Sequence, residues 1–561
     1  MLARLLLTFL PLAGTVVSQT VEAYDYIVVG AGPTGIVAAE RFAEAGKKVL
    51  LIERGGPSTA ETGGTDIPPW PKKTNLTRFD ISGVFEDFFA PTNSNPYWWC
   101  DDITPFAGCV VGGGTAINGL LYWYPPDVEY STTNGWPTGW QSIGTYVNKL
   151  KARLPATETP SSDGKLYLTQ VYDVVKSLLD KQGYSQYVIN DSPNTKDHAY
   201  GRPGYYAQNG KRTGPMDTYL KTSKTRPNFK LLMHTKVLSL VRNGSQITGV
   251  RVSNTTVNGN GIISLTTKGR VVLAAGVFGT AKILYQSGIG PADMLAITAG
   301  NPATANFMPP ASQYINLPVG HFVRDSPGVN LVFTHPTVDD YDNWAPVWGN
   351  PRPTDANQFV TTQSGVFAYA SPRANFWRVY QGPDGISRHI QGTARPGSCC
   401  FTPTYPYNTT AQFTITVYIG TGLTSVGRIG IDSSLQGTIL TKPWLTDPVE
   451  KIVLTNAITD LLSTYKQVPG LQLISPDNTT SIAAHVTNMA AGSNHWTAST
   501  RIGNNSTTSV VDPNTKVWNT NNLFIVDAGI YPGAFVANPQ GSLMVMAEIA
   551  AAKILGLGGG T

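Results

Sequence analysis

A strand–helix–strand unit with a glycine-rich first turn lies near the start of this chain. Residues 24–30 form an apolar run of buried-strand length, residues 36–45 have a helical composition, and residues 48–53 predict a second strand. The turn between the first strand and the helix reads Gly-Ala-Gly-Pro-Thr-Gly, which has the spacing G-x-G-x-x-G. This unit predicts an α/β fold class with a Rossmann-like domain built on a parallel sheet.

Each glycine of the turn is expected to have a distinct structural role. Gly30 permits the tight turn, Gly32 lets the backbone approach a pyrophosphate, and Gly35 allows the helix to pack closely on the strand. The amino terminus of the helix attracts the anion. Glu53, at the end of the second strand, is placed to accept hydrogen bonds from an adenosine ribose, and its charge disfavours NADP. On this motif alone FAD and NAD are equal candidates, and a turn that binds no phosphate is the alternative.

The length of 561 residues requires more than one folded unit. Residues 269–275 and 522–527 read as buried strands and are expected to join the first sheet. In the material between them, alternation in residues 412–419 and 427–431 predicts antiparallel strands, and residues 446–465 predict a helix. We therefore expect two domains, the second with an antiparallel sheet flanked by helices. The FAD-binding domain is expected at residues 24–125, 230–320 and 495–561, and the substrate-binding domain at residues 126–229 and 321–494.

The charge balance excludes a nucleic-acid-binding surface. The chain has 41 Lys and Arg against 36 Asp and Glu, a net charge of +5, and only 14 % of its residues are charged. The longest basic runs are pairs such as Lys47-Lys48. Recognition of nucleic acid would require a clustered basic patch.

Residues 1–18 are typical of a secretion signal peptide. Arg4 precedes an apolar stretch from Leu5 to about Ala13, and small residues follow. A membrane anchor is the alternative, but Pro11 interrupts a stretch shorter than the roughly 20 apolar residues that a span needs. We therefore expect a secreted, extracellular protein that does not associate with a membrane. Acceptor sequons for N-glycosylation, which support export, lie at Asn75, Asn190, Asn243, Asn254, Asn408, Asn478, Asn504 and Asn505.

Four cysteines, Cys100, Cys109, Cys399 and Cys400, permit three pairings in an oxidising compartment. The first two have a spacing that suits closure of a local loop, whereas a bridge between the adjacent last two would be strained, so mixed or free states stay open. The motifs CxxC and HExxH are absent from the sequence, and its seven histidines are scattered. We therefore predict no metal site.

Two further glycine-rich segments resemble a known enzyme family. Residues 108–118 read GCVVGGGTAIN and residues 276–290 read GVFGTAKILYQSGIG. They are similar to the two signatures of the glucose–methanol–choline (GMC) flavoprotein oxidoreductases, although Val277 and Ala281 depart from the usual residues of the second signature. The resemblance covers about residues 24–557 and implies FAD as the cofactor.

Within that family, the segments WWCDDITPFAGC, NGKRTGP, SNHW and ANPQGS look most like the flavin domain of fungal cellobiose dehydrogenases. Those proteins carry a haem domain before the flavin domain. Here the expected signal peptide leads almost directly into the first strand, so we expect no haem.

The resemblance implies a role for each residue of the site. His495 would be the catalytic base and Asn538 its partner at the reacting oxygen, because a neutral imidazole of ordinary pKa near 6.5 takes a proton and an amide donates without charge. Apart from the resemblance, a single histidine is more often a structural residue. Implied cofactor-binding residues are Gly30, Gly32, Gly35, Glu53, Arg54, Gly112, Gly113, Gly114, Thr115, Asn118, Val237, Asp527, Ala528, Pro539 and Gln540. Implied substrate-binding residues are Glu86, Phe89, Arg395, Ser493 and Asn494, and the nearby aromatic residues Trp98, Trp99 and Tyr124 serve either the substrate or the core.

The expected function is oxidation of the anomeric C1 hydroxyl of cellobiose or a related oligosaccharide to the lactone, by hydride transfer to flavin N5 with His495 as base. We expect a monomer whose partners are a carbohydrate and an electron acceptor such as a quinone, oxygen or a separate redox protein. Two alternatives stay open. One is a GMC oxidase of aryl or simple alcohols that uses oxygen, and the other is a secreted flavin-binding or sugar-binding glycoprotein without turnover.

Overall fold

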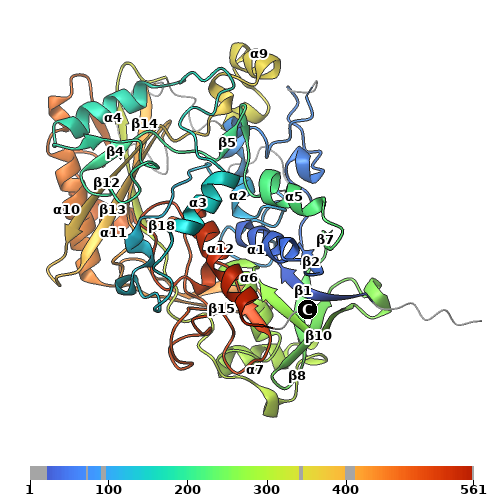
Figure 1. Cartoon of the computed structure of the whole chain (residues 1–561). Helices are drawn as coiled ribbons and strands as arrows, with labels where there is room; N and C mark the ends of the chain where they lie inside the picture. The colour runs from blue at the N-terminus through green and yellow to red at the C-terminus, as the bar shows by residue number, and fades with distance from the viewer. Residues whose placement is uncertain (1–21, 71–73, 90–95, 340–344, 399–410, 559–561) are drawn as a thin grey trace, which may run out of the picture.

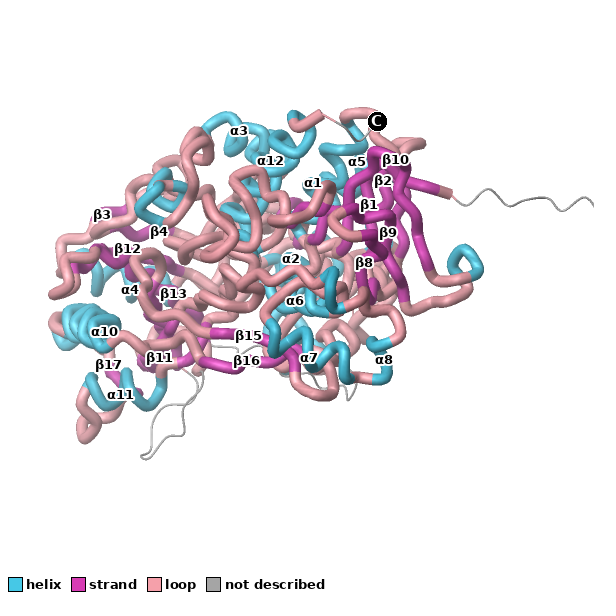
Figure 2. Tube along the Cα trace, turned by 90° about the horizontal axis from the view of Figure 1, so that it is seen from below, coloured by secondary structure: helices cyan, strands magenta, loops and turns pink. Residues whose placement is uncertain are grey.

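The protein has two lobes, each built around one β-sheet (Figures 1 and 2). The computed structural model describes residues 22–70, 74–89, 96–339, 345–398 and 411–558. The helix α12 (Gln540–Gly556) lies between the two sheets, beside α1 (Pro33–Glu44) (Figure 1). The other α-helices are α2 (Gly114–Ile117), α3 (Gly144–Arg153), α4 (Gln170–Asp180), α5 (Lys221–Lys224), α6 (Gly276–Tyr285), α7 (Ala292–Gly300), α8 (Pro302–Ala305), α9 (Pro353–Thr362), α10 (Pro448–Leu462) and α11 (Ile482–Met489).

The first sheet contains the strand–helix–strand unit that the glycine turn predicts. Its strands are β1 (Ala23–Val29), β2 (Val49–Ile52), β7 (Phe229–Leu232), β8 (Val237–Asn243), β9 (Gln246–Val252), β10 (Ile262–Leu273) and β19 (Leu523–Ile525). Within the described residues the order is β7-β2-β1-β10-β9-β8, with β19 on β10. The pairs β2–β7, β1–β2, β1–β10 and β10–β19 are parallel, whereas β8, β9 and the start of β10 run antiparallel. The strands expected at 269–275 and 522–527 therefore do join this sheet.

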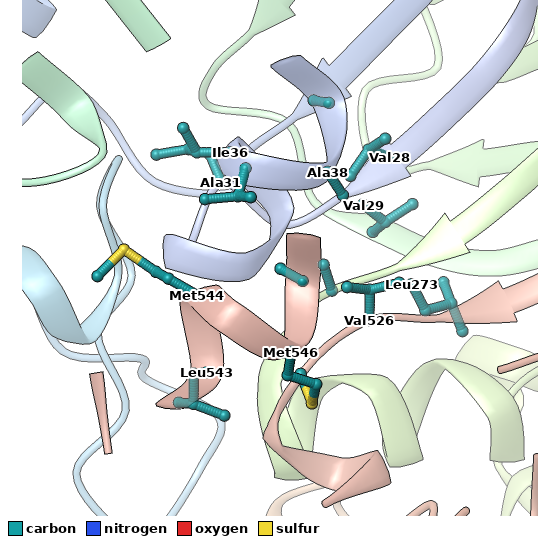
Figure 3. Packing of buried hydrophobic residues seen from close by; sticks show 14 of the residues in the cluster. Val28, Val29, Ala31, Ile36, Ala38, Leu273, Val526, Leu543, Met544 and Met546 are labelled. Carbon is teal, nitrogen blue, oxygen red and sulfur yellow. The ribbon is translucent and has the colours of Figure 1, made fainter. Parts of the chain in front are cut away.

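Helices α1 and α12 pack against each other and against this sheet through apolar side chains (Figure 3). Val28 on β1, Ile36 on α1 and Met544 on α12 are all fully buried. Pro33 suits the first turn of α1, because a helix does not use the N–H group that proline lacks at this position. Gly46 stops the chain from continuing as helix, with a left-handed φ of 77°. The glycine turn is thus fixed between a buried strand and a buried helix.

The second sheet is largely antiparallel. Its strands are β3 (Ser185–Gln186), β4 (Ala199–Gly201), β11 (Pro327–Thr334), β12 (Ala374–Gln381), β13 (Ser387–Pro396), β14 (Gln412–Ile419), β17 (Gln472–Ser475) and β18 (Ala491–Gly492). Within the described residues the order is β17-β11-β14-β13-β12-β4-β3, with β18 on β11. Helices α4, α10 and α11 lie on one side of it (Figure 1). The helix expected at 446–465 is α10.

Strand β14 shows why this sheet has two different faces. Successive side chains of a strand point to opposite sides, so its odd-numbered residues, among them Phe413 and Ile415, share one face and its even-numbered residues share the other. The odd-numbered residues belong to a buried cluster with α4 and α10. The even-numbered Thr416 and Tyr418 line a cavity instead. The sheet therefore carries an apolar face for the helices and a polar face for the interior of the molecule.

The strand expected at 427–431 forms, but outside the larger sheet. It is β15 (Arg428–Ile431) and pairs with β16 (Gly437–Thr441) in a separate hairpin, much as β5 (Ala207–Gln208) pairs with β6 (Lys211–Arg212). The intervening turn is short, and the Asp432 carboxylate accepts hydrogen bonds from the backbone N–H groups of Ser434 and Gln436. Local closure through this turn takes precedence over pairing with a distant strand.

The structure describes only some of the residues on which the expectation of export rests. The expected signal peptide, Asn408, Cys399 and Cys400 lie outside the described residues. Asn190 is buried, accepts from the Tyr124 N–H at 2.8 Å and donates to the Tyr122 carbonyl at 2.9 Å, so the folded chain cannot present this sequon to solvent. In the described part of the chain, no helix combines the length and the apolar character needed to cross a bilayer.

Replacing Gly35 by Ala should destabilise the protein. The new Cβ would lie 2.0 Å from the Gly30 carbonyl oxygen, closer than any real contact, so the turn or α1 must shift. Overpacking of this kind costs about 1–3 kcal/mol. Urea unfolding should show that loss for Gly35→Ala. Gly144→Ala is the matched control, because a Cβ on this exposed glycine of α3 meets nothing within 4 Å in the described residues, and equal stability of the two variants would contradict the packing role of Gly35.

Candidate cofactor and substrate site

A cavity of about 910 Å³ is lined by residues of both lobes. Nineteen of the residues that the sequence analysis assigned to the site lie on its wall: Gly30, Gly32, Glu53, Arg54, Glu86, Phe89, Gly113, Gly114, Asn118, Val237, Arg395, Ser493, Asn494, His495, Asp527, Ala528, Asn538, Pro539 and Gln540. Gly35, Gly112 and Thr115 lie behind the wall. One cavity therefore brings together most of the predicted cofactor and substrate residues.

The glycine turn presents bare backbone to the cavity. A Cβ added at Gly32 would meet no atom of the described residues within 4 Å, so this position faces open space. Gly32 is also the N-cap of α1, and because it has no side chain it cannot cap the N–H groups of the first helical turn. These groups and the helix dipole suit the pyrophosphate of a dinucleotide.

Glu53 braces the glycine turn as well as facing the cavity. Its carboxylate accepts the Ala31 N–H at 2.9 Å and the Gly55 N–H at 2.8 Å. Burial raises the pKa of this carboxyl group, although the two N–H donors act in the opposite direction. A carboxylate has about four acceptor positions, so the remaining ones can accept hydroxyl groups of a ribose. The residue fits the role that its position at the end of the second strand predicts.

Only part of the second glycine-rich segment, residues 108–118, lines the cavity. Gly113 and Gly114 line it, but a Cβ at Gly112 would press against the sulfur of Met216, and the Thr115 hydroxyl donates to the Gly112 carbonyl at 2.6 Å. Gly112 and Thr115 do not line the cavity, and their assignment as cofactor-binding residues stays a prediction. Both shape the loop from its protein-facing side.

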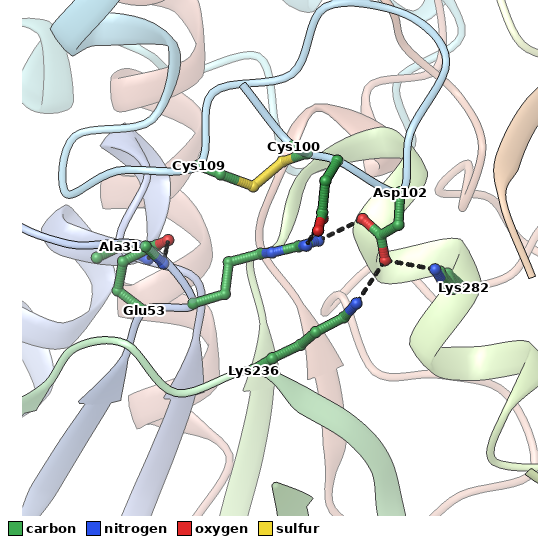
Figure 4. Close-up of a disulfide and its surroundings, with 10 residues drawn as sticks. Ala31, Glu53, Cys100, Asp102, Cys109, Lys236 and Lys282 are labelled. Carbon is green, nitrogen blue, oxygen red and sulfur yellow. Dashed lines mark hydrogen bonds and ion pairs between the residues drawn. A yellow bond between two sulfur atoms is a disulfide. The ribbon is translucent and has the colours of Figure 1, made fainter. Parts of the chain in front are cut away.

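A loop closed by a disulfide lines the cavity together with Glu53, and Figure 4 shows the disulfide and its surroundings. Cys100 and Cys109 are bonded, the local pairing whose spacing looked favourable in the sequence. Within the loop, the Asp102 carboxylate pairs with Arg54 at 2.6 Å, and the same carboxylate pairs with two lysines. Those lysines are Lys236 at 2.7 Å and Lys282 at 2.5 Å. Burial opposes ionisation, but the three cations hold the pKa of Asp102 well below its usual value.

His495 lies on the cavity wall as a neutral imidazole. Burial lowers its pKa to about 4, well below the ordinary value near 6.5 assumed from the sequence. Its backbone N–H donates to the Asp325 carboxylate at 2.7 Å, and Trp444 donates to the same carboxylate at 3.0 Å. Burial raises the pKa of Asp325 to about 7 even though these donors lower it. Asp325 thus fixes the main chain that carries His495.

Asn538 and Tyr418 lie on the wall near the imidazole. The Asn538 carbonyl oxygen accepts from Trp123 at 3.2 Å and from Gln391 at 2.9 Å. Its amide nitrogen donates to the Tyr418 hydroxyl at 3.4 Å. The Tyr418 ring lies edge-on to the His495 ring, with 6.0 Å between the centroids. An uncharged base and an amide donor therefore share one part of the cavity.

The expected substrate residues are only partly available to a ligand. Glu86 accepts from Arg395 at 2.6 Å and from Ser371 at 2.6 Å, and this ion pair lies on the cavity wall. The Ser493 hydroxyl instead donates to the Ser326 carbonyl at 2.8 Å.

The Asn494 side chain is hydrogen-bonded to the protein at both ends of its amide. Its amide nitrogen donates to the Phe106 carbonyl at 2.8 Å, and its carbonyl oxygen accepts from Trp496 at 2.8 Å. These bonds position the loop before His495, and because Ser493 and Asn494 also line the cavity, their assignment as substrate-binding residues stays a prediction.

Aromatic side chains line the part of the cavity that is open to solvent. Phe89 and Phe106 are 41 % and 54 % exposed, and Trp99 packs on both with centroid distances of 5.4 and 4.8 Å. All three line the cavity, whereas Trp98 and Tyr124 are buried in the core. In the described residues, no group of three or more His, Cys, Asp or Glu side chains is placed to hold a metal ion.

The sequence analysis missed Tyr418, Thr393, Gln391 and Asp325. The first three lie on the polar face of the second sheet, on β14 and β13. The alternation of QFTITVYI would have grouped Tyr418 with Thr416, but nothing local says that this face meets a histidine more than 70 residues away in the chain. Asp325 has no motif of its own.

Replacing Gly32 by Val should leave the fold intact and block the cofactor. The Cβ would enter the cavity without meeting an atom of the described residues within 4 Å, at a backbone φ of −73° that valine accepts. The variant should unfold at the temperature of the flavin-free parent and emerge from gel filtration without flavin absorbance. Full flavin content in Gly32→Val would contradict the placement of the pyrophosphate at this turn.

Comparisons with known proteins agree with this architecture. Family models described as GMC oxidoreductase match residues 24–327 and 424–547. An oxygen-dependent choline dehydrogenase of Stenotrophomonas maltophilia is 26 % identical over 297 residues, 49 % of this chain and 50 % of that protein, so the chain spans about half the length of such relatives. A sinalpyl alcohol oxidase of Nesocodon mauritianus is 24 % identical over 95 % of this chain and 89 % of that protein.

Solved structures share the fold at low identity. A crystal structure of formate oxidase superimposes with a TM-score of 0.74 at 17 % identity, covering 96 % of this chain and 99 % of that one. An FAD-dependent oxidoreductase from Chaetomium thermophilum gives 0.72 at 18 % identity, covering 95 % and 99 %. The family and such neighbours indicate FAD as the cofactor for the glycine-lined part of the cavity. The two family models cover most of the chain, and the protein belongs to the GMC oxidoreductase family.

Proposed function

We propose that this protein is a secreted FAD-dependent oxidoreductase that oxidises the CH–OH group of a carbohydrate, with the anomeric hydroxyl of cellobiose or a related oligosaccharide as the site of reaction. One observation carries the proposal. A neutral imidazole, that of His495, and an amide donor, that of Asn538, lie on the wall of a cavity whose other part is lined by glycine backbone.

The residues divide the chemistry between them. FAD, held by the glycine turn at Gly32 and by Glu53, would supply the acceptor for the hydride of the substrate carbon. His495 takes the hydroxyl proton, and it is ready to do so because burial keeps it unprotonated at neutral pH. Asn538 donates a hydrogen bond to the substrate oxygen, which gains negative charge as the proton leaves. The cavity walls would hold the substrate in a geometry that favours reaction.

The side chains that line the cavity support a carbohydrate as the substrate. Polar groups on the second sheet, Thr416 and Arg395 among them, suit hydroxyl groups, and Phe89, Phe106 and Trp99 suit the C–H face of a sugar ring. The same aromatic cluster favours a second candidate, an aryl alcohol, for which the alcohol oxidase of Nesocodon mauritianus is a relative. For either substrate, we propose a quinone, oxygen or a separate redox protein as the acceptor.

Export and glycosylation belong to the same proposal. Six sequons are exposed on the surface, at Asn75, Asn243, Asn254, Asn478, Asn504 and Asn505. The Cys100–Cys109 disulfide supports an oxidising compartment. We propose an extracellular monomer, without a nucleic-acid or membrane partner.

A substrate panel tests the proposed reaction. Under anaerobic conditions, cellobiose and longer oligosaccharides should bleach the flavin absorbance of the wild-type protein, and benzylic alcohols should leave it unchanged. Bleaching by benzylic alcohols alone would favour the aryl alcohol candidate. If neither class bleaches the flavin, the result would favour the third reading, a flavin-binding or sugar-binding glycoprotein without turnover. Readmitting oxygen or a benzoquinone then identifies the acceptor.

The pH dependence of flavin reduction tests the base. Because the pKa of His495 is lowered to about 4, the neutral imidazole is present at any higher pH, and the rate constant of reduction should stay level from neutral pH down to about pH 5 before it falls. An ordinary histidine would lose rate already below about pH 6.5. His495→Ala should bind FAD and reduce it about 10²- to 10⁴-fold more slowly. An unchanged rate in that variant would rule out His495 as the base.

A further inference from the structure

We propose that Gln391 and Trp123 are positioning residues that fix the side-chain amide of Asn538 in one orientation, with its NH₂ group toward the substrate. This inference deepens the proposed function and rests on it. Neither residue belongs to the cavity wall, so they act through Asn538 and not on the substrate.

The hydrogen bonds at Asn538 come from two sides. Gln391 Nε2 and Trp123 Nε1 both reach the Asn538 Oδ1 atom, at 2.9 and 3.2 Å. An indole N–H can only donate, so the amide atom that faces Trp123 must be the carbonyl oxygen. The NH₂ group must then lie on the other side of the amide. There it meets the Tyr418 hydroxyl, which lies on the cavity wall next to His495.

Reversing the amide would be unfavourable. The NH₂ group would then face the Trp123 indole, which cannot accept a hydrogen bond and would lose its own acceptor in a buried place, since Trp123 is 2 % exposed. The Gln391 Nε2 donor, on a side chain that is 0 % exposed, would lose the same acceptor unless its own amide turned as well. Without these two donors, Asn538 could present its oxygen to the substrate as readily as its NH₂ group. An oxygen acceptor would repel the negative charge that develops on the substrate oxygen. The two donors therefore select the useful orientation.

Gln391 and Trp123 are both held in place by Trp377. Gln391 on β13 is paired in register with Trp377 on β12. The Trp377 ring meets the Trp123 ring edge-on, with 5.0 Å between the centroids and an interplanar angle of 88°. Asn538 directly precedes the residues that begin α12, whereas Gln391 belongs to the second sheet. The amide is thus held from both lobes at the point where they meet. Donation to its oxygen also polarises the amide and strengthens its N–H groups as donors.

A double-mutant cycle tests the inference. Gln391→Met keeps the length of the side chain and removes the donor. In the wild-type background it should slow anaerobic flavin reduction about 10- to 100-fold at saturating substrate with little change in KM, because the interaction matters in the transition state. In the Asn538→Ala background the same change should have no further effect, because the amide to be positioned is gone. A merely structural role would slow both backgrounds equally.

Two further variants provide a control and a second test. Gln412→Met makes the same change at an equally buried glutamine on the neighbouring strand β14, away from the cavity wall, and should keep the wild-type rate. Trp123→Phe removes the second donor and should also lose its effect when Asn538 is Ala. If Gln391→Met fails to fold, Trp123→Phe takes its place in the cycle.

The outcomes are distinguishable. Equal slowing by Gln391→Met in both backgrounds, or no slowing in the wild type, would overturn the positioning role while leaving the proposed function in place. If Asn538→Ala itself reduces the flavin at the wild-type rate, the proposed role of Asn538 in the reaction fails, and the positioning inference fails with it. Flavin content and thermal unfolding of each variant, measured in parallel, confirm that the rates refer to folded, FAD-loaded protein.

Discussion

The alternation of side chains along the strands of the second sheet is the constraint on which the site depends. It gives β13 and β14 one face of Ile, Val and Phe for α4 and α10, and an opposite face that carries Gln391, Thr393 and Tyr418. A shift of register by one residue would turn these polar groups into the helices and the apolar groups into the cavity. The same packing that stabilises the second lobe therefore sets the chemistry of the cavity wall.

Burial then determines the electrostatics of that wall. The imidazole of His495 stays neutral because charging it inside the protein is costly, and its pKa falls accordingly. Charged groups near the cavity are paired with protein partners, as Asp102 is with three cations and Glu86 with Arg395. The part of the cavity near His495 is left to uncharged donors and acceptors. Such an environment suits a reaction in which charge appears only transiently on a substrate oxygen.

The first lobe could be predicted closely from the sequence, because its signals are local. The turn from Gly30 to Gly35 and the strand before it can be predicted from about thirty consecutive residues, and both lie where expected. His495 and Asn538 were identified by resemblance, and the cavity brings them together. The domain boundaries and the choice of sugar remain predictions.

Other features depend on contacts that no local pattern reports. The pKa of His495 follows from burial, which a sequence does not display. The structure supplies Ser493 and Asn494 each with a protein partner that the sequence does not indicate. Gln391 could not be connected to Asn538, since 147 positions separate them and only the meeting of the two lobes joins them.

A crystal structure of the protein with FAD and an unreactive sugar analogue tests the central claim most directly. The account predicts the isoalloxazine ring against the Gly113–Gly114 backbone, and the analogue's hydroxyl within about 2.6–3.2 Å of both the His495 imidazole and the Asn538 amide nitrogen. An analogue hydroxyl bound far from His495, or an Asn538 amide with its oxygen toward the analogue, would contradict the account.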